Sequence, residues 1–191
     1  MVDTWRSSGP VRAQLLGLPD HDQVLVETLQ QSRVVLGFAA DDSVKGHVPV
    51  THFRVINAGD PALPYLHRWS GAVTSLDALE KSASGTGSLS FFPDADGVVR
   101  RVPLLINIDG KVMSTLTSEV LRVGMNQRNY TAKTTAARVG PIEFHSGVAE
   151  VRIGPLVVPT TAKGEFWVHY TETRNDKIRE DIRRQRYIEA W

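Results

Sequence analysis

The apolar residues of this chain gather in short runs, each about as long as a β-strand. The two densest runs are residues 34–40 (Val-Val-Leu-Gly-Phe-Ala-Ala) and residues 102–106 (Val-Pro-Leu-Leu-Ile). Neither approaches the roughly 18–20 consecutive apolar residues that a membrane-spanning helix needs. With 191 residues, the chain is long enough to bury these runs in the core of one domain. We therefore expect a folded domain whose core contains several strands.

A helix signal precedes the first apolar run. Asp20 or Asp22 can cap the helix, and Leu25 and Leu29 would share its buried face. The strand expected at residues 33–38 follows at once, and its continuous apolar, β-branched character predicts burial on both faces. A helix followed directly by a buried strand is typical of an α/β fold.

The next segments continue this alternation. Residues 53–57 favour a second strand, and residues 75–83 favour a short helix with Leu76 and Leu79 facing inward. The Gly-Thr-Gly sequence at 85–87 is expected to end that helix. We predict a mixed β-sheet flanked by helices. The other expected elements are strands at 88–92, 98–106, 148–153, 156–158 and 165–170, a turn at 109–110, and a helix that Ser114 caps, that carries Leu116, Val120 and Leu121, and that ends at Gly124.

Residues 93–97 (Pro-Asp-Ala-Asp-Gly) have the composition of a tight turn. Pro93 fixes φ and Gly97 permits a positive φ. Asp94 and Asp96 are also spaced like the first ligands of a calcium loop, but residues 98–101 add no carboxylate. A hairpin turn is therefore favoured over a metal site.

Two adjacent arginines follow the turn. As neighbours in an expected strand, Arg100 and Arg101 would point to opposite faces. One would pair with Asp94 or Asp96 and brace the turn, and the other could reach an anionic ligand. Bracing is the favoured role.

Composition and motifs exclude several classes of function. The 22 Lys and Arg residues nearly balance 21 Asp and Glu residues, so no nucleic-acid partner is expected. The chain has no cysteine, and it lacks the phosphate-binding and nucleophile-elbow motifs. His47 and His52 are close enough in sequence for a zinc site, but surface or packing roles are favoured. We therefore expect a protein that is not an enzyme, with no catalytic residues, metal or cofactor.

Residues 87–124 resemble the CHASE type 2 family of bacterial extracellular sensor domains. The resemblance rests on the Pro-Asp-x-Asp-Gly turn, the arginine and Pro-Leu strand that follow it, and a helix opened by Ser-Thr-Leu. The motif positions are Pro93, Asp94, Asp96, Gly97, Pro103 and Ser114. Segments at 22–37, 151–170 and 187–191 are also similar to the family, which extends the resemblance over residues 20–191.

The resemblance also suggests how the chain is organised. Residues 1–19 are expected to form an irregular lead-in, and residues 20–191 a single, partial CHASE-type-2-like domain. Within it, the charge-rich residues 171–191 are predicted to be helical. The family's opening strand, its Trp-Pro-Trp-x-Arg-like helix and its closing strand have no counterpart here. We therefore expect an incomplete sensor domain.

The resemblance implies an extracytoplasmic sensory module, the periplasmic or extracellular part of an inner-membrane protein. Its covalent partners would be membrane helices and a cytoplasmic cyclase or kinase, and a homodimer stays open. The signal would be an unknown small ligand or none, and the predicted ligand-binding residues are Arg100, Arg101, Asp60 and Tyr65. Two alternatives stand beside this reading: a ligand-free structural or dimerisation module, and a soluble small-molecule-binding domain.

Overall fold

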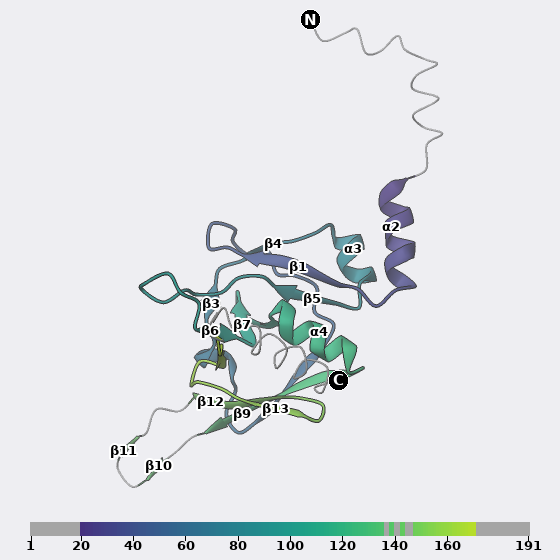
Figure 1. The fold of residues 1–191 in the computed structure, drawn as a ribbon. Coiled ribbons are helices and arrows are strands. Elements are labelled where there is room, and N and C mark those ends of the chain that lie inside the picture. Colours follow the sequence, from purple (N-terminus) through teal and green to yellow (C-terminus); the bar gives the residue numbers. More distant parts are fainter. Residues whose placement is uncertain (1–19, 136–137, 140–141, 144–146, 171–191) are drawn as a thin grey trace, which may run out of the picture.

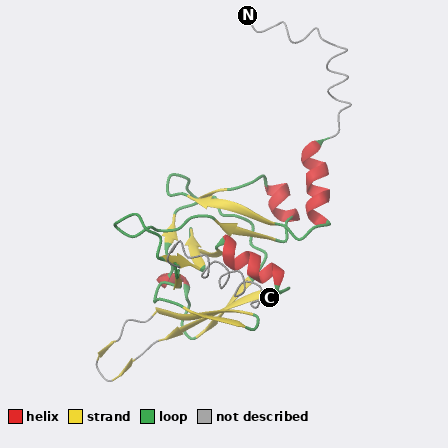
Figure 2. Cartoon of the chain, in the orientation of Figure 1, coloured by secondary structure: helices red, strands yellow, loops and turns green. Residues whose placement is uncertain are grey.

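The computed structural model describes residues 20–135, 138–139, 142–143 and 147–170. It has the predicted α/β fold, in which small mixed sheets pack around a central helix (Figures 1 and 2). The helices are α2 (His21–Gln30), α3 (Asp77–Ser82), α4 (Leu116–Gly124) and the short 3-10 helix η2 (Leu63–Tyr65). None of the helices in the described residues is long and apolar enough to cross a membrane. The predicted lead-in at 1–19 and helix at 171–191 lie outside the described residues.

The largest sheet has the strand order β13-β12-β9-β2. It is mixed, because β2 runs parallel to β9 while β12 is antiparallel to both β9 and β13. Two three-stranded sheets, β4-β1-β5 and β3-β7-β8, each also contain one parallel and one antiparallel pair. The strands of these sheets are β1 (Val35–Ala40), β2 (Arg54–Ala58), β3 (Arg68–Trp69), β4 (Ala72–Val73), β5 (Gly85–Ser88), β7 (Leu105–Ile108), β8 (Lys111–Ser114), β9 (Asn129–Thr135), β12 (Gly147–Ile153) and β13 (Leu156–Pro159).

Two antiparallel pairs complete the described structure. One joins β6 (Arg101–Pro103) to β14 (Glu165–Trp167), and the other is the hairpin of β10 (Arg138–Val139) and β11 (Ile142–Glu143). Helix α4 lies in the middle, where it contacts β1, β5 and β12, while α2 and α3 lie side by side at one end (Figure 1).

Strand β7 separates two apolar clusters. Leu105 belongs to the cluster that contains Phe53, Tyr130 and Val151, whereas Ile106 and Ile108 belong to the cluster around Phe38, Trp69 and Met113. Alternate side chains of one strand face opposite sides, so β7 serves as a wall for both clusters. All four residues of β7 are buried. The apolar run at 102–106 shares Leu105 and Ile106 with this strand, and a continuous apolar run suits a strand buried on both faces.

The prediction that the first apolar run is buried on both faces is wrong. Phe38 is buried, but Gly37 and Ala39 in the same strand are exposed. The facing of several helical residues also differs from expectation. In α2, Val26 and Leu29 are buried while Leu25 is exposed, and Leu76 and Val120 lie on the solvent side of their segments. Apolar spacing alone could not tell which face of these short elements meets the core.

The Gly-Thr-Gly sequence does not end a helix but forms most of β5. This strand runs parallel to β1 with every residue buried, and the strand expected at 88–92 stops at Ser88. Its glycines are needed for close approach: a Cβ on Gly87 would lie 2.5 Å from Leu116 Cα, and one on Gly85 would collide with the Glu119 carboxylate. Helix α4 therefore packs directly on the backbone of β5.

Strand β12 contains a bulge that shifts the alternation of its side chains. Val148 pairs with Thr134 and Glu150 pairs with Lys133, so Ala149 is the extra residue. The bulge places Val148 in the core together with Val151 and Ile153. In a regular strand, side-chain alternation would put Val148 on the face opposite to these two residues.

Replacing Gly87 with alanine should destabilise the domain by about 3 kcal/mol. The added methyl would meet the backbone of α4, which cannot rotate away as a side chain could. The matched control is Gly124→Ala at the end of α4, where a Cβ meets nothing within 4 Å. Urea unfolding should show a large loss of stability for Gly87→Ala and little or none for Gly124→Ala. Equal effects would contradict the close approach of α4 to β5.

Candidate functional site

The turn at residues 93–97 has the predicted hairpin geometry. The Asp94 amide donates to the Val98 carbonyl at 2.9 Å, and the Gly97 amide donates to the Asp94 carbonyl at 2.8 Å. Gly97 has a φ of 80°, in the left-handed region that glycine adopts without strain. The short turn therefore depends on Gly97 for its closure, because other residues adopt a positive φ only at a cost.

Arg100 braces the turn through both aspartates. Its guanidinium donates to the two carboxylate oxygens of Asp96 at 2.9 and 2.7 Å and to Asp94 at 3.1 Å. The hydrogen bonds from Arg100, with a further one from the Val98 amide, lower the pKa of Asp96 to about 2. The carboxylates of the turn are thus engaged by arginine, and no cluster able to hold a metal ion occurs among the described residues.

Arg101 binds the same turn, so the prediction that the two arginines point to opposite faces is wrong. Its Nη2 lies 2.6 Å from Asp94 Oδ1, and its guanidinium lies 5.6 Å from the centroid of the Trp167 ring. The reason is that β6 begins only at Arg101, so strand alternation does not govern Arg100. Whether either arginine also contacts a ligand stays a prediction.

A buried carboxylate extends this cluster to β14. Glu165, only 4% exposed, accepts a hydrogen bond from Thr161 Oγ1 at 2.9 Å. Its other oxygen, Oε1, lies 2.7 Å from His67 Nε2, while Arg101 Nη1 lies 3.8 Å from Oε2, the oxygen that Thr161 binds. Together with pairing to β6, these polar contacts hold β14 against the domain.

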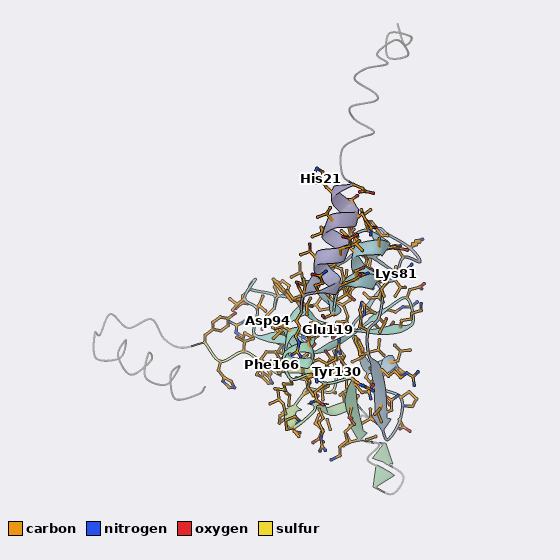
Figure 3. The ribbon with its side chains drawn as sticks, turned by 90° about the vertical axis from the view of Figure 1, so that its right-hand side faces the viewer. His21, Lys81, Asp94, Glu119, Tyr130 and Phe166 are labelled. Carbon is orange, nitrogen blue, oxygen red and sulfur yellow. The ribbon has the colours of Figure 1, made fainter. Side chains whose placement is uncertain are left out.

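A second ionic group lies in the interior around Glu119 of α4 (Figure 3). The Glu119 side chain is fully buried and accepts a hydrogen bond from Tyr130 Oη at 2.8 Å. Ser114 Oγ lies 3.0 Å from the same carboxylate and 3.2 Å from the Thr86 carbonyl oxygen. The prediction that Ser114 caps α4 is therefore wrong. Thr115 occupies the N-cap position of α4, and Ser114 is the last residue of β8.

Arg122 neutralises the buried carboxylate from one turn further along α4. It donates to Glu119 through Nε at 2.9 Å and Nη2 at 2.5 Å, and to the carbonyls of Gln127 and Ser84 at 2.8 and 3.1 Å. Burial by itself would lower the pKa of Arg122, but the hydrogen bonds and charge of Glu119 outweigh it and leave this pKa raised. Burial, followed by the charge of Glu119, raises the pKa of Tyr130.

A cavity of about 570 Å³ adjoins this ionic group. Arg122 forms part of its wall, and Arg54 and Arg128 contribute two further cations. Arg54 opens β2, whose parallel pairing with β9 sets it beside Asn129. The complete lining is Thr51, His52, Phe53, Arg54, Arg122, Arg128 and Asn129.

The other predicted site residues lie elsewhere. The carbonyl of Asp60 accepts a hydrogen bond from Thr134 of β9, and Tyr65 ends η2 and packs against the first apolar cluster. Pro103 is buried in β6, paired with Glu165. A ligand-binding role for Asp60 and Tyr65 stays a prediction.

The two loop histidines have the surface and packing roles that were favoured: His47 is exposed and His52 is partly buried. His47 Nε2 lies 2.6 Å from Thr74 Oγ1, and His52 Nε2 lies 2.9 Å from the Glu80 carbonyl. Glu80 itself is buried in α3, where its carboxylate accepts a hydrogen bond from the Val50 amide.

Sequence reasoning missed the ionic group and the cavity. The helix was judged by its apolar residues, yet the side chains that α4 buries most completely are Ser118, Glu119 and Arg122. A signal was present: Arg122 follows Ser118 by four positions and Glu119 by three, so it shares a helix face with both. The cavity had no comparable signal, because Arg54 and Arg128 are far apart in sequence and meet only through the pairing of β2 with β9.

The fold and its sites define an α/β domain with a buried ionic group, a braced turn and a cationic cavity. A family model described as the CHASE2 domain matches residues 2–190, nearly the whole chain. The chain therefore belongs to the CHASE2 family of extracellular sensor domains, which confirms the resemblance noted in its sequence. Comparison with curated proteins and with solved structures finds no match.

Replacing Arg100 with glutamine should return the pKa of Asp96 from about 2 toward its ordinary value of 3.8. Because the folded-state pKa is depressed, Asp96 stabilises the turn above about pH 3.8 and this contribution is lost as the pH falls toward 2. Carboxyl NMR titration measures the shift directly. The control Arg68→Gln, at an exposed site in β3, should leave the Asp96 pKa unchanged. An unchanged pKa in Arg100→Gln would contradict the bracing role.

Replacing Glu119 with glutamine should cost about 3 kcal/mol of unfolding free energy, because Arg122 would keep a buried and uncompensated charge. The matched control is Glu27→Gln in α2, where the carboxylate is exposed. Chemical unfolding should show a change within about 0.5 kcal/mol for this control. Similar small effects in both variants would mean that the buried ion pair does not stabilise the domain.

Proposed function

We propose that this chain is the extracytoplasmic signal-input module of a bacterial transmembrane signalling protein, and that it couples a signal to a cyclase or kinase output. The observation that carries the proposal is the family match over residues 2–190. On this proposal the module faces the periplasm or the exterior, and membrane helices connect it to the output domain.

A sensor needs a structural element with two states whose populations the signal can shift. Strand β14 suits this role for two reasons. It is the last strand of the described residues, and it is held by one strand pairing and a few polar contacts. Those contacts converge on Glu165, and Arg101 lies between Glu165 and Asp94 of the braced turn. A change at the turn would thus reach β14 through Arg101, whose side chain contacts Glu165 and whose backbone pairs with Trp167.

A ligand-free dimerisation module is the second candidate, and one observation favours it. Leu89, Phe91 and Val98, on either side of the turn, expose 55%, 54% and 40% of their surface. Exposed apolar side chains grouped in one segment are typical of surfaces that another protein covers. Sedimentation of the 191-residue chain as a function of concentration distinguishes the candidates, because this alternative requires a dimer whose stability falls in Phe91→Ser.

The orientation of the module tests the main proposal. A reporter enzyme that is active only outside the cytoplasm, fused in frame behind this domain in the complete gene, should be active. The complete gene should also encode apolar segments of about 20 residues and a cyclase or kinase domain. An inactive reporter with an active cytoplasmic counterpart, or a gene without these segments, would reject the proposal.

Arg101→Ala in the complete protein should alter the basal cyclase or kinase output. The side chain joins Asp94 to Glu165, so its removal loosens β14 from the turn. The control is Arg152→Ala, which removes a half-exposed arginine of β12 whose only ion pair in the described residues is with Glu150. Output is measured in membranes at equal protein amounts, with thermal unfolding of the isolated domain to verify folding. Unchanged output and unchanged stability in Arg101→Ala would remove this residue from the signalling path.

A further inference from the structure

We infer that the cavity beside α4 binds a small molecule carrying a carboxylate or phosphate group, with Arg54 and Arg128 as the cations that hold it. The inference deepens the proposed function by naming the chemical class of the signal, and its signalling part rests on that function. Binding itself can be tested separately.

The charge of the cavity points to an anion. Arg54, Arg122 and Arg128 all line it, together with the imidazole of His52, and no Asp or Glu is among the described residues of its lining. Cations gathered on the wall of a concave site create a positive potential that attracts anions. Of the three arginines, Arg122 alone forms an ion pair within the described residues, with Glu119, so Arg54 and Arg128 give the wall a net positive charge.

The three arginines differ in how far they are already used. Arg122 already donates hydrogen bonds to Glu119, Gln127 and Ser84, and it is only 5% exposed. Arg54 and Arg128 are exposed, and within the described part of the chain neither forms an ion pair. Arginine donors in a planar fork suit bidentate contacts with carboxylate and phosphate oxygens. Arg54 and Arg128 are therefore the groups available to bind, whereas the charge of Arg122 is already compensated by Glu119.

The size and the remaining lining define the ligand further. A volume of about 570 Å³ lies in the range of small-molecule sites. Thr51 and Asn129 offer polar groups at the edge, and the buried Phe53 offers an apolar surface. The site would thus accept a small organic acid or a phosphorylated metabolite, and inorganic phosphate would be its minimal occupant.

The position of the cavity connects binding to the core. Its wall combines the start of β2, the residues just before and at the start of β9, and Arg122 of α4. An anion held there would draw β2 and β9 toward the end of α4 without disturbing Glu119, since that carboxylate keeps its own partners. In the intact receptor, the ligand would contact α4, the helix that packs on β5, differently in the two signalling states.

The test compares two double variants of the 191-residue chain. Arg54→Gln with Arg128→Gln removes the two cavity cations, and Arg33→Gln with Arg68→Gln removes two exposed arginines that do not line the cavity. Both variants lower the net charge equally. Inorganic phosphate, succinate and the neutral analogue succinamide are titrated by calorimetry and by amide NMR, and circular dichroism verifies folding.

We expect phosphate or succinate, and not succinamide, to bind the unmodified chain and the control with shifts at the Asn129 and Thr51 amides. Affinity should fall about tenfold or more for each cavity arginine removed. Absence of binding by either anion, shifts located elsewhere, or equal loss in both double variants would overturn the inference. If the cavity variant unfolds, the single variant Arg128→Lys replaces it, and unchanged binding in that folded variant and in Arg54→Lys counts against the site.

Binding and signalling can fail separately. Anion binding that leaves the output of the complete receptor unchanged would keep the site and overturn its signalling role. A correctly oriented, signalling receptor whose domain binds none of the anions would keep the proposed function and overturn the inference.

Discussion

A carboxylate without access to water sets the arrangement of the centre of this domain. Glu119 is fully buried, and an ionised carboxylate in such a place is costly unless charge and hydrogen bonds compensate it. Arg122, Tyr130 and Ser114 provide that compensation from α4, β9 and β8. Because each partner comes from a different element, the group can be satisfied only when all three elements are in place. Gly85 belongs to the same constraint, since any side chain there would occupy the space of the carboxylate.

This constraint explains why local reasoning succeeded at the turn and failed at α4 and β5. The residues that form the turn at 93–97 and the arginine that braces it lie within eight positions of one another, so the sequence contains nearly the whole interaction. The Gly-Thr-Gly sequence is different, because its requirement for glycine comes from Leu116 and Glu119, about thirty positions away. A glycine pair that ends a helix and one that admits a helix against a strand look alike until the partner is known.

The same distinction holds for the candidate sites. The residues Pro93, Asp94, Asp96 and Gly97 could be predicted to form a turn, because they are consecutive or nearly so in sequence. The cavity could not, because Arg54 and Arg128 come together only when β2 pairs in parallel with β9. Parallel pairing of strands separated by more than seventy residues is a property of the fold, and single-sequence patterns contain little trace of it.

The two polar groups differ in how easily their contacts can change. The group around Glu119 is buried and many-partnered, so breaking it is expensive and its geometry stays fixed. In the group around Asp94, Arg101 and Glu165, Glu165 is buried, but the two arginines that bind Asp94 are about two-fifths exposed, so the contacts of the turn can rearrange at smaller cost. A domain that reports a signal needs both, a rigid centre against which a ligand can bind and a weaker junction that can change state. The cavity adjoins the rigid group, because Arg122 belongs to both. The more adaptable group holds β14. Helix α4 and the strands that it contacts form the structure between the two groups.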